Sequence, residues 1–137
     1  MKIQHVPPEY VNQVWLQVSD FVQAAIDGQE GESDYTLDQV RTFVTAGKWM
    51  LVVAVTGDNK VRGCAVVNFF NRPNHRVAFI THIGGRLVTN PDTFNQFRTL
   101  LTTFGATSIE GAVTDAVARL WRRFGFIEKY KIVEVKL

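Results

Sequence analysis

The stretch "DAVARLWRRFGFIEKY", residues 115–130, joins a short amphipathic helix to a strand-like segment. Leu120, Trp121 and Phe124 recur at helical spacing and give the helix one apolar face. Gly125 follows them, where a residue in left-handed geometry commonly ends a helix. The segment after it, "FIEKYKIVEVKL" (126–137), is rich in β-branched and aromatic residues and predicts a long final strand.

Three apolar runs upstream predict an antiparallel meander. They are "KWMLVVAV" (48–55), "VRGCAVVNFF" (61–70) and "RVAFITHI" (76–83), and short turn sequences separate them. A helix at 91–104 then leads to the strand "TSIEGAV" (107–113), and a strand–helix–strand crossover makes its two strands parallel. The sheet therefore changes direction between 76–83 and 107–113, and ligands bind where neighbouring strands part in this way.

Helix signals complete the order of elements. A short strand at 2–6 precedes a helix over 11–26, whose apolar residues repeat with a period of three to four. A second helix opens at Thr36, with Gln39 placed for a reciprocal capping box. The Asn-Pro pair at 90–91 supplies a cap and a first helical residue for the third helix.

These elements predict one α+β domain over residues 1–137. Its sheet is expected to be mixed and mostly antiparallel, with six to seven strands, one splayed parallel pair and four helices. A chain of 137 residues is long enough to bury a core, and no repeat or low-complexity tract divides it.

Composition excludes several classes of protein. The net charge of +2 is too small to indicate a nucleic-acid-binding protein. The single Cys64 excludes an intramolecular disulfide and a Cys-pair metal site, and no metal is expected. The sequence has no apolar run of about 20 residues and no signal-peptide pattern, so it predicts a cytoplasmic protein without a membrane span.

The element order and the ending "DAVARLWRRFGF" resemble the Gcn5-related N-acetyltransferase superfamily. In that family a strand–helix–Gly-Phe–strand unit reads close to N-x-x-A-x-x-L-Y-x-x-x-G-F. The resemblance covers nearly the whole chain in element order, and residues 115–126 at the level of sequence. It implies that acetyl-CoA lies in the splay and that acetyl is transferred to an amine of a small molecule or a protein. Gly125 then has a structural role as the helix stop, and Phe126 packs over it.

The resemblance also implies a cofactor-binding loop after the fourth strand. The family's [R/Q]-x-x-G-x-[G/A] loop directs backbone N–H groups at the pyrophosphate, beside a helix N-terminus. The implied cofactor residues are Ile83, Gly84, Gly85, Arg86, Leu87, Val88 and Thr89, with Asp115 at the start of the last helix. The glycine spacing departs from the family's, Pro91 lacks an N–H, and Asp92 adds a negative charge. These departures predict that acetyl-CoA binds weakly or not at all and that turnover on common amines is undetectable.

Three residues are candidates for the chemistry. Trp121 stands where the family often has a general-acid Tyr, but an indole N–H is not a proton source near pH 7, and the alternative is core packing. His82, at the end of the fourth strand, is a candidate base for an ammonium, or simply a strand-end histidine. Glu110 is a second candidate base if its side chain faces the splay.

Two functional hypotheses stay open at this point. In the first, the chain is an acyl-CoA-dependent N-acyltransferase with a variant loop. In the second, it keeps the fold without the chemistry and is a binding or structural protein, similar to degenerate bacteriophage-encoded relatives. The sequence does not set the oligomeric state or the acceptor.

Overall fold

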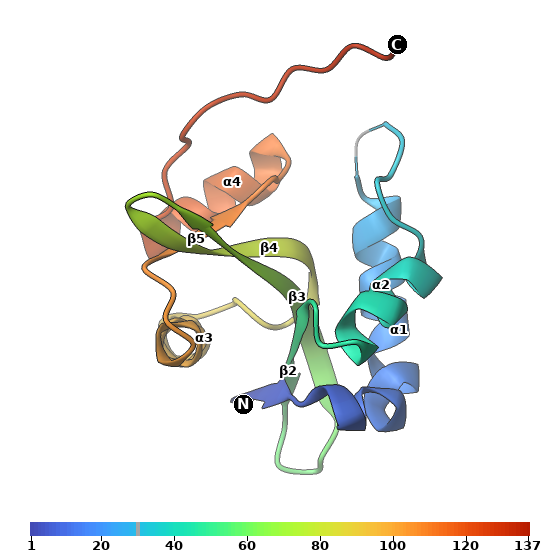
Figure 1. Ribbon diagram of the computed structural model, residues 1–137. Helices are drawn as coiled ribbons and strands as arrows, with labels where there is room; N and C mark the ends of the chain where they lie inside the picture. The colour runs from blue at the N-terminus through green and yellow to red at the C-terminus, as the bar shows by residue number, and fades with distance from the viewer. Residues whose placement is uncertain (30) are drawn as a thin grey trace.

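A mixed β-sheet with helices on both faces organises the structure (Figure 1). The computed structural model describes residues 1–29 and 31–137. Within them the strands are β1 (Lys2–Val6), β2 (Met50–Val55), β3 (Val61–Arg72), β4 (His75–Gly85) and β5 (Ser108–Gly111). The helices are α1 (Val11–Asp27), α2 (Leu37–Thr45), α3 (Pro91–Thr103) and α4 (Asp115–Trp121), with 3₁₀ turns η1 (Pro8–Tyr10) and η2 (Arg122–Phe124).

The strands lie in the sheet in chain order, β1-β2-β3-β4-β5. Pairs β1–β2, β2–β3 and β3–β4 are antiparallel. Strands β4 and β5 are parallel, with Val77 opposite Ser108 and Ile80 opposite Gly111. The predicted meander and the predicted parallel pair are both confirmed.

Each face of the sheet carries its own core, because successive strand residues point to opposite sides. Helices α1 and α2 cover one face, where they pack on Leu51, Val53, Cys64 and Val66. Helices α3 and α4 lie on the other face (Figure 1), over Val52, Ala65, Ala78 and Ile80. Burial raises the pKa of the Cys64 thiol to about 12, so Cys64 is a buried apolar residue, as predicted.

The predicted helix ends are confirmed. Thr36 Oγ1 accepts a hydrogen bond from Gln39 N at 3.2 Å, and Gln39 Oε1 accepts one from Thr36 N at 2.9 Å. Asn90 caps α3 in the same way, and Gly125 ends η2 with a φ of 93°. No helix of the described residues is both long enough and apolar enough to cross a membrane.

The predicted final strand is wrong. Residues 126–137 contain no helix and no strand, so the sheet of the described residues has five strands rather than six to seven. Figure 1 shows this segment leaving the sheet beyond α4 as an extended tail. The reason is physical: strand propensity reflects how a residue fits a paired, half-buried surface, and a segment without a paired neighbour does not form a strand.

Candidate functional site

Strand β4 loses its second neighbour halfway along its length. The β4–β5 ladder ends at Ile80 and Gly111, whereas β4 continues to Gly85. From Thr81 onward its outer edge pairs with no other strand of the described residues. Backbone N–H and C=O groups on such an edge are free to bind another chain or a ligand.

A β-bulge begins where the two strands part. On the β3 side, Val67 lies opposite Ile80, but Val66 lies opposite His82, so Thr81 is an inserted residue. The insertion moves His82 to the face covered by α1 and α2, although alternation from Ile80 alone would place it on the opposite face. Bulges commonly re-aim a side chain next to an active site, and this one re-aims an imidazole.

His82 is a buried histidine with one unpaired nitrogen. It is 3% exposed, and its ring centroid lies 6.1 Å from that of Tyr35 and 6.3 Å from that of Trp49. Nδ1 lies 3.0 Å from Thr81 Oγ1, and Nε2 has no hydrogen-bond partner among the described residues. Burial lowers the pKa of His82, which favours the neutral ring.

The tautomer of His82 follows from Thr81. The Thr81 hydroxyl donates its one proton to Val66 O at 3.0 Å, so it can only accept from the imidazole. This assigns the ring proton to Nδ1 and leaves a lone pair on Nε2. The unpaired nitrogen is therefore an acceptor, as a base requires.

Glu110 lies in a different electrostatic environment. It stands opposite Phe79 in the parallel ladder, on the same face as His82. Its carboxylate pairs with the Arg72 guanidinium and, at 3.6 Å, with Lys129 Nζ. The hydrogen bond from Arg72 lowers the pKa of Glu110, followed by the charges of Arg72 and Lys129. A carboxylate stabilised in this way is a poor proton acceptor, so Glu110 is the weaker candidate base.

Trp121 is a core residue of the opposite face. It is 5% exposed, and its ring lies 4.8 Å from that of Phe126. A Cβ on Gly111 would lie 3.2 Å from Trp121 Cζ3, so the indole fills the space beneath β5. Its position supports the packing interpretation given above, because the sheet separates Trp121 from His82.

The two glycines of the expected cofactor loop allow close packing within the chain. A Cβ on Gly84 would lie 2.6 Å from the carbonyl oxygen of Phe21 in α1. Gly85 has a φ of 69°, and a Cβ there would lie 2.5 Å from Arg62 O. Glycine is therefore required at both positions by α1 and β3, irrespective of any phosphate.

Several amides of the loop and of the start of α3 already have acceptors. Arg86 N donates to Arg62 O at 2.9 Å, and the N–H groups of Thr89 and Asn90 each lie 3.4 Å from Thr93 Oγ1. The first turn of α3 is closed by Thr93 N, which donates to Asn90 Oδ1 at 2.9 Å. Few donors are left for a bound anion.

The remaining loop groups add little anion binding. Between Arg86 and Thr93, the amides without an acceptor among the described residues are those of Leu87, Val88 and Asp92. Leu87 and Val88 are buried in the core, and the Asp92 carboxylate accepts from Gln96 Nε2 at 3.0 Å. Arg86 is exposed and is the one cation of the loop, while Asp115 is an exposed acid in the first turn of α4.

The site therefore fits the extended, amide-bearing arm of acetyl-CoA better than its diphosphate. An extended chain that carries amides can add to an open strand edge, and the outer edge of β4 beyond Ile80 offers that surface. The loop supplies little for a diphosphate. The described residues contain no group of three or more His, Cys, Asp or Glu that could hold a metal ion.

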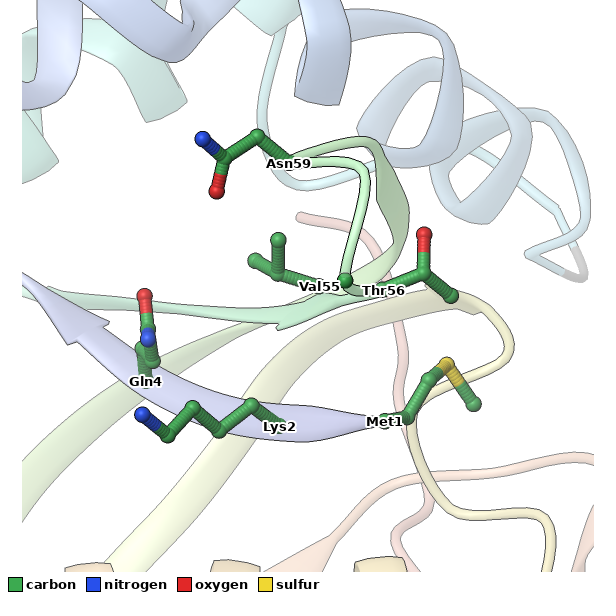
Figure 2. Close-up of a pocket in the computed structure, with 7 residues that line it drawn as sticks. Met1, Lys2, Gln4, Val55, Thr56 and Asn59 are labelled. Carbon is green, nitrogen blue, oxygen red and sulfur yellow. The ribbon is translucent and has the colours of Figure 1, made fainter.

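A depression elsewhere on the surface contains none of these candidates. Figure 2 shows it at the β1–β2 edge, where Lys2 and Gln4 of β1 lie near Asn59 of the β2–β3 turn.

Sequence reasoning missed Thr81 as a partner of His82, because an inserted residue is visible only in the strand pairing. Tyr35 and Trp49 were also missed, and no signal in the sequence relates them to His82.

No protein-family model matches the sequence. A comparison with curated proteins also gives no match. Solved structures, in contrast, are similar over the whole chain. A ribosomal-protein-alanine N-acetyltransferase from Brucella melitensis biovar Abortus 2308 has a TM-score of 0.68 at 8% identity, over 100% of both chains.

Two further structures agree. An aminoglycoside acetyltransferase from an uncultured soil metagenomic sample, in complex with sisomicin, has a TM-score of 0.69 at 12% identity over 99% of this chain and 94% of that chain. A probable acetyltransferase has a TM-score of 0.70 at 9% identity, over 100% of this chain and 97% of that one. The chain has the fold of the Gcn5-related N-acetyltransferases, as its sequence predicts.

Proposed function

We propose that this protein is an N-acyltransferase that uses an acyl-CoA thioester and an amine acceptor, with His82 as the base. The observation that carries the proposal is the bulge at Thr81, which re-aims His82 in the half of β4 with one neighbour, where its buried Nε2 has no partner among the described residues. The similar solved structures include acetyltransferases that act on amines, which supports the same class of reaction.

The chemistry needs a deprotonated amine next to a polarised carbonyl. Acetyl-CoA, when bound, supplies the activated thioester carbonyl. An acceptor amine is an ammonium near pH 7 and must lose a proton before it attacks. His82 Nε2 accepts that proton, directly or through one water, while Thr81 Oγ1 holds the Nδ1 proton and keeps the ring oriented.

The open edge of β4 has the second role. N–H groups that no strand engages can donate to an oxygen on which negative charge develops, and such preorganised donors stabilise acyl transfer. Glu110 and Trp121 have no chemical role in this proposal. Glu110 is held by Arg72, and Trp121 lies in the core of the other face.

The test combines binding with turnover. Calorimetry with acetyl-CoA is expected to show weak binding, because loss of two charged hydrogen bonds, each about 1.5–3 kcal/mol, moves a micromolar ligand toward the millimolar range. Thiol release is then followed over a panel of amines. His82→Gln should lower kcat by roughly 10²–10⁴-fold.

His75→Gln is the matched control, because His75 is an exposed histidine at the other end of the same strand. It should leave turnover unchanged. Absence of both binding and thiol release for the unmodified chain would contradict the proposal and favour a protein that has kept only the fold.

A further inference from the structure

The C-terminal tail, residues 127–137, exposes an unusual amount of apolar surface. Ile127 is 86% exposed, Ile132 77%, Val133 90% and Val135 81%. These are β-branched residues, which are enriched in strands, yet the tail contains no strand. Apolar residues gathered on one exposed segment indicate an interaction site more often than single exposed residues do.

An open strand edge lies next to this tail. Strand β5 is the last strand of the sheet and pairs with β4 alone among the described residues. Its other edge, over Ser108–Gly111, presents backbone groups to which another strand can bond. Open edges of this kind attract extended segments.

The start of the tail is fixed close to that edge. The Phe126 ring packs on Phe94 at 5.7 Å, and Lys129 Nζ lies 3.6 Å from Glu110 on β5. Arg72 donates to Tyr130 Oη at 3.2 Å. The side chains of Lys129 and Tyr130 therefore reach Glu110 of β5 and its ion-pair partner Arg72.

Beyond Tyr130 the tail moves away from its own β5. Lys136 Nζ lies 4.0 Å from Glu32, in the segment between α1 and α2, and Figure 1 shows the C-terminus on that side of the molecule. Seven residues, 131–137, thus lie extended and without strand partners. One chain presents both an unpaired edge and an unpaired strand-forming segment that leaves from beside it.

We propose that two copies of this chain form a dimer in which residues 131–137 of each pair with the outer edge of β5 of the other. A second copy fits because it supplies both missing parts at once. A two-fold axis beside Glu110 would lay each tail on the partner's edge, and the same contact would form twice. The proposal is independent of the proposed activity, since it depends only on β5 and the tail.

The oligomeric state of the full chain tests the proposal first. Light scattering after size exclusion should give twice the 15.5 kDa of one chain. A chain that ends at Tyr130 should be a monomer. Val133→Asp should weaken dimerisation at least tenfold, and Leu16→Asp is the matched control, because Leu16 in α1 is also 90% exposed.

Cross-linking then distinguishes this exchange of C-terminal tails between two copies from any other contact between them. Chains with Ala112→Cys and chains with Val133→Cys are mixed and oxidised; Ala112 is exposed directly after β5, and the native Cys64 is buried. A disulfide between the two kinds of chain supports exchange. A monomeric full chain, a truncated chain that remains a dimer, or a bond that forms only within doubly substituted chains would overturn the proposal.

Discussion

The two halves of β4 differ in what holds them. From Val77 to Ile80 the strand has a neighbour on each side, and its side chains are largely buried in the core. From Thr81 to Gly85 it has β3 alone, an inserted residue, a buried imidazole and two closely packed glycines. The paired half is built for stability. The half with one neighbour carries the polar groups from which we infer a function, and each prediction below tests this division.

The largest effect is expected beneath the paired half. Trp121→Ala removes a buried indole that packs on Phe126 and beneath Gly111. It should lower the free energy of unfolding by about 3–5 kcal/mol, as measured by urea denaturation. Leu120→Ala is the control, because Leu120 is the adjacent residue of α4 and its side chain is 45% exposed. Equal losses in the two variants would show that Trp121 is not a core residue.

In the half with one neighbour, the largest effect should come from a glycine. Gly84→Ala places a methyl group 2.6 Å from Phe21 O and must move α1 or β4. We expect a loss of about 1–3 kcal/mol in the free energy of unfolding, by the same method. Gly57→Ala serves as the control, since nothing lies within 4 Å of a Cβ there. An unchanged Gly84→Ala protein would mean that α1 does not press on this half.

The burial of His82 should make the protein less stable at acidic pH. Burial lowers its pKa in the folded state, so protons bind the unfolded chain more readily, and protonation favours unfolding. Stability should be fully present above about pH 6.5, the ordinary pKa of histidine, and should fall as the pH drops below it. His82→Gln should reduce this slope in urea titrations between pH 5 and 8, with a remainder from His5, whose pKa burial also lowers. An unchanged slope would refute the burial of His82.

The smallest effect belongs to Glu110. Arg72 lowers the pKa of this carboxyl, so the contribution of the pair is present above about pH 4.3, the ordinary pKa of Glu, and is lost as the pH falls. The pair is partly exposed, and such pairs contribute about 0–1 kcal/mol. Glu110→Gln should therefore slightly reduce the pH dependence of the free energy of unfolding below pH 4.3. It should leave that dependence near pH 6.5 unchanged. A change near pH 6.5 would show that Glu110 is coupled to His82.

The sequence predicts the parts of the fold that depend on local pattern. Turn lengths predict the meander, and the crossover helix predicts the parallel pair. The caps at Thr36 and Asn90 were predictable because each involves residues three positions apart. The final strand was predicted wrongly because strand formation also depends on a partner, and no pattern in residues 126–137 reports where they lie.

The candidate site shows the same limit. The position of His82 at the strand end was predictable, but its face depends on Thr81, and a one-residue insertion changes pairing without changing composition. Gly84 and Gly85 were assigned to a phosphate because small residues permit close approach. The same property permits close approach of Phe21 and Arg62, and the sequence does not say which neighbour comes near.

The amides at the start of α3 are engaged by side chains of the same turn, and this affects which acyl donors the protein can distinguish. Asn90 and Thr93 are covalently tethered to the amides that they engage, so a free anion competes with an acceptor of high effective concentration. The nucleotide end of an acyl-CoA therefore adds little binding affinity at the start of α3. Under the proposed activity, we expect the protein to discriminate poorly between full acyl-CoA and a short acyl-pantetheine, and to read its thioester donor mainly by the arm that lies along β4.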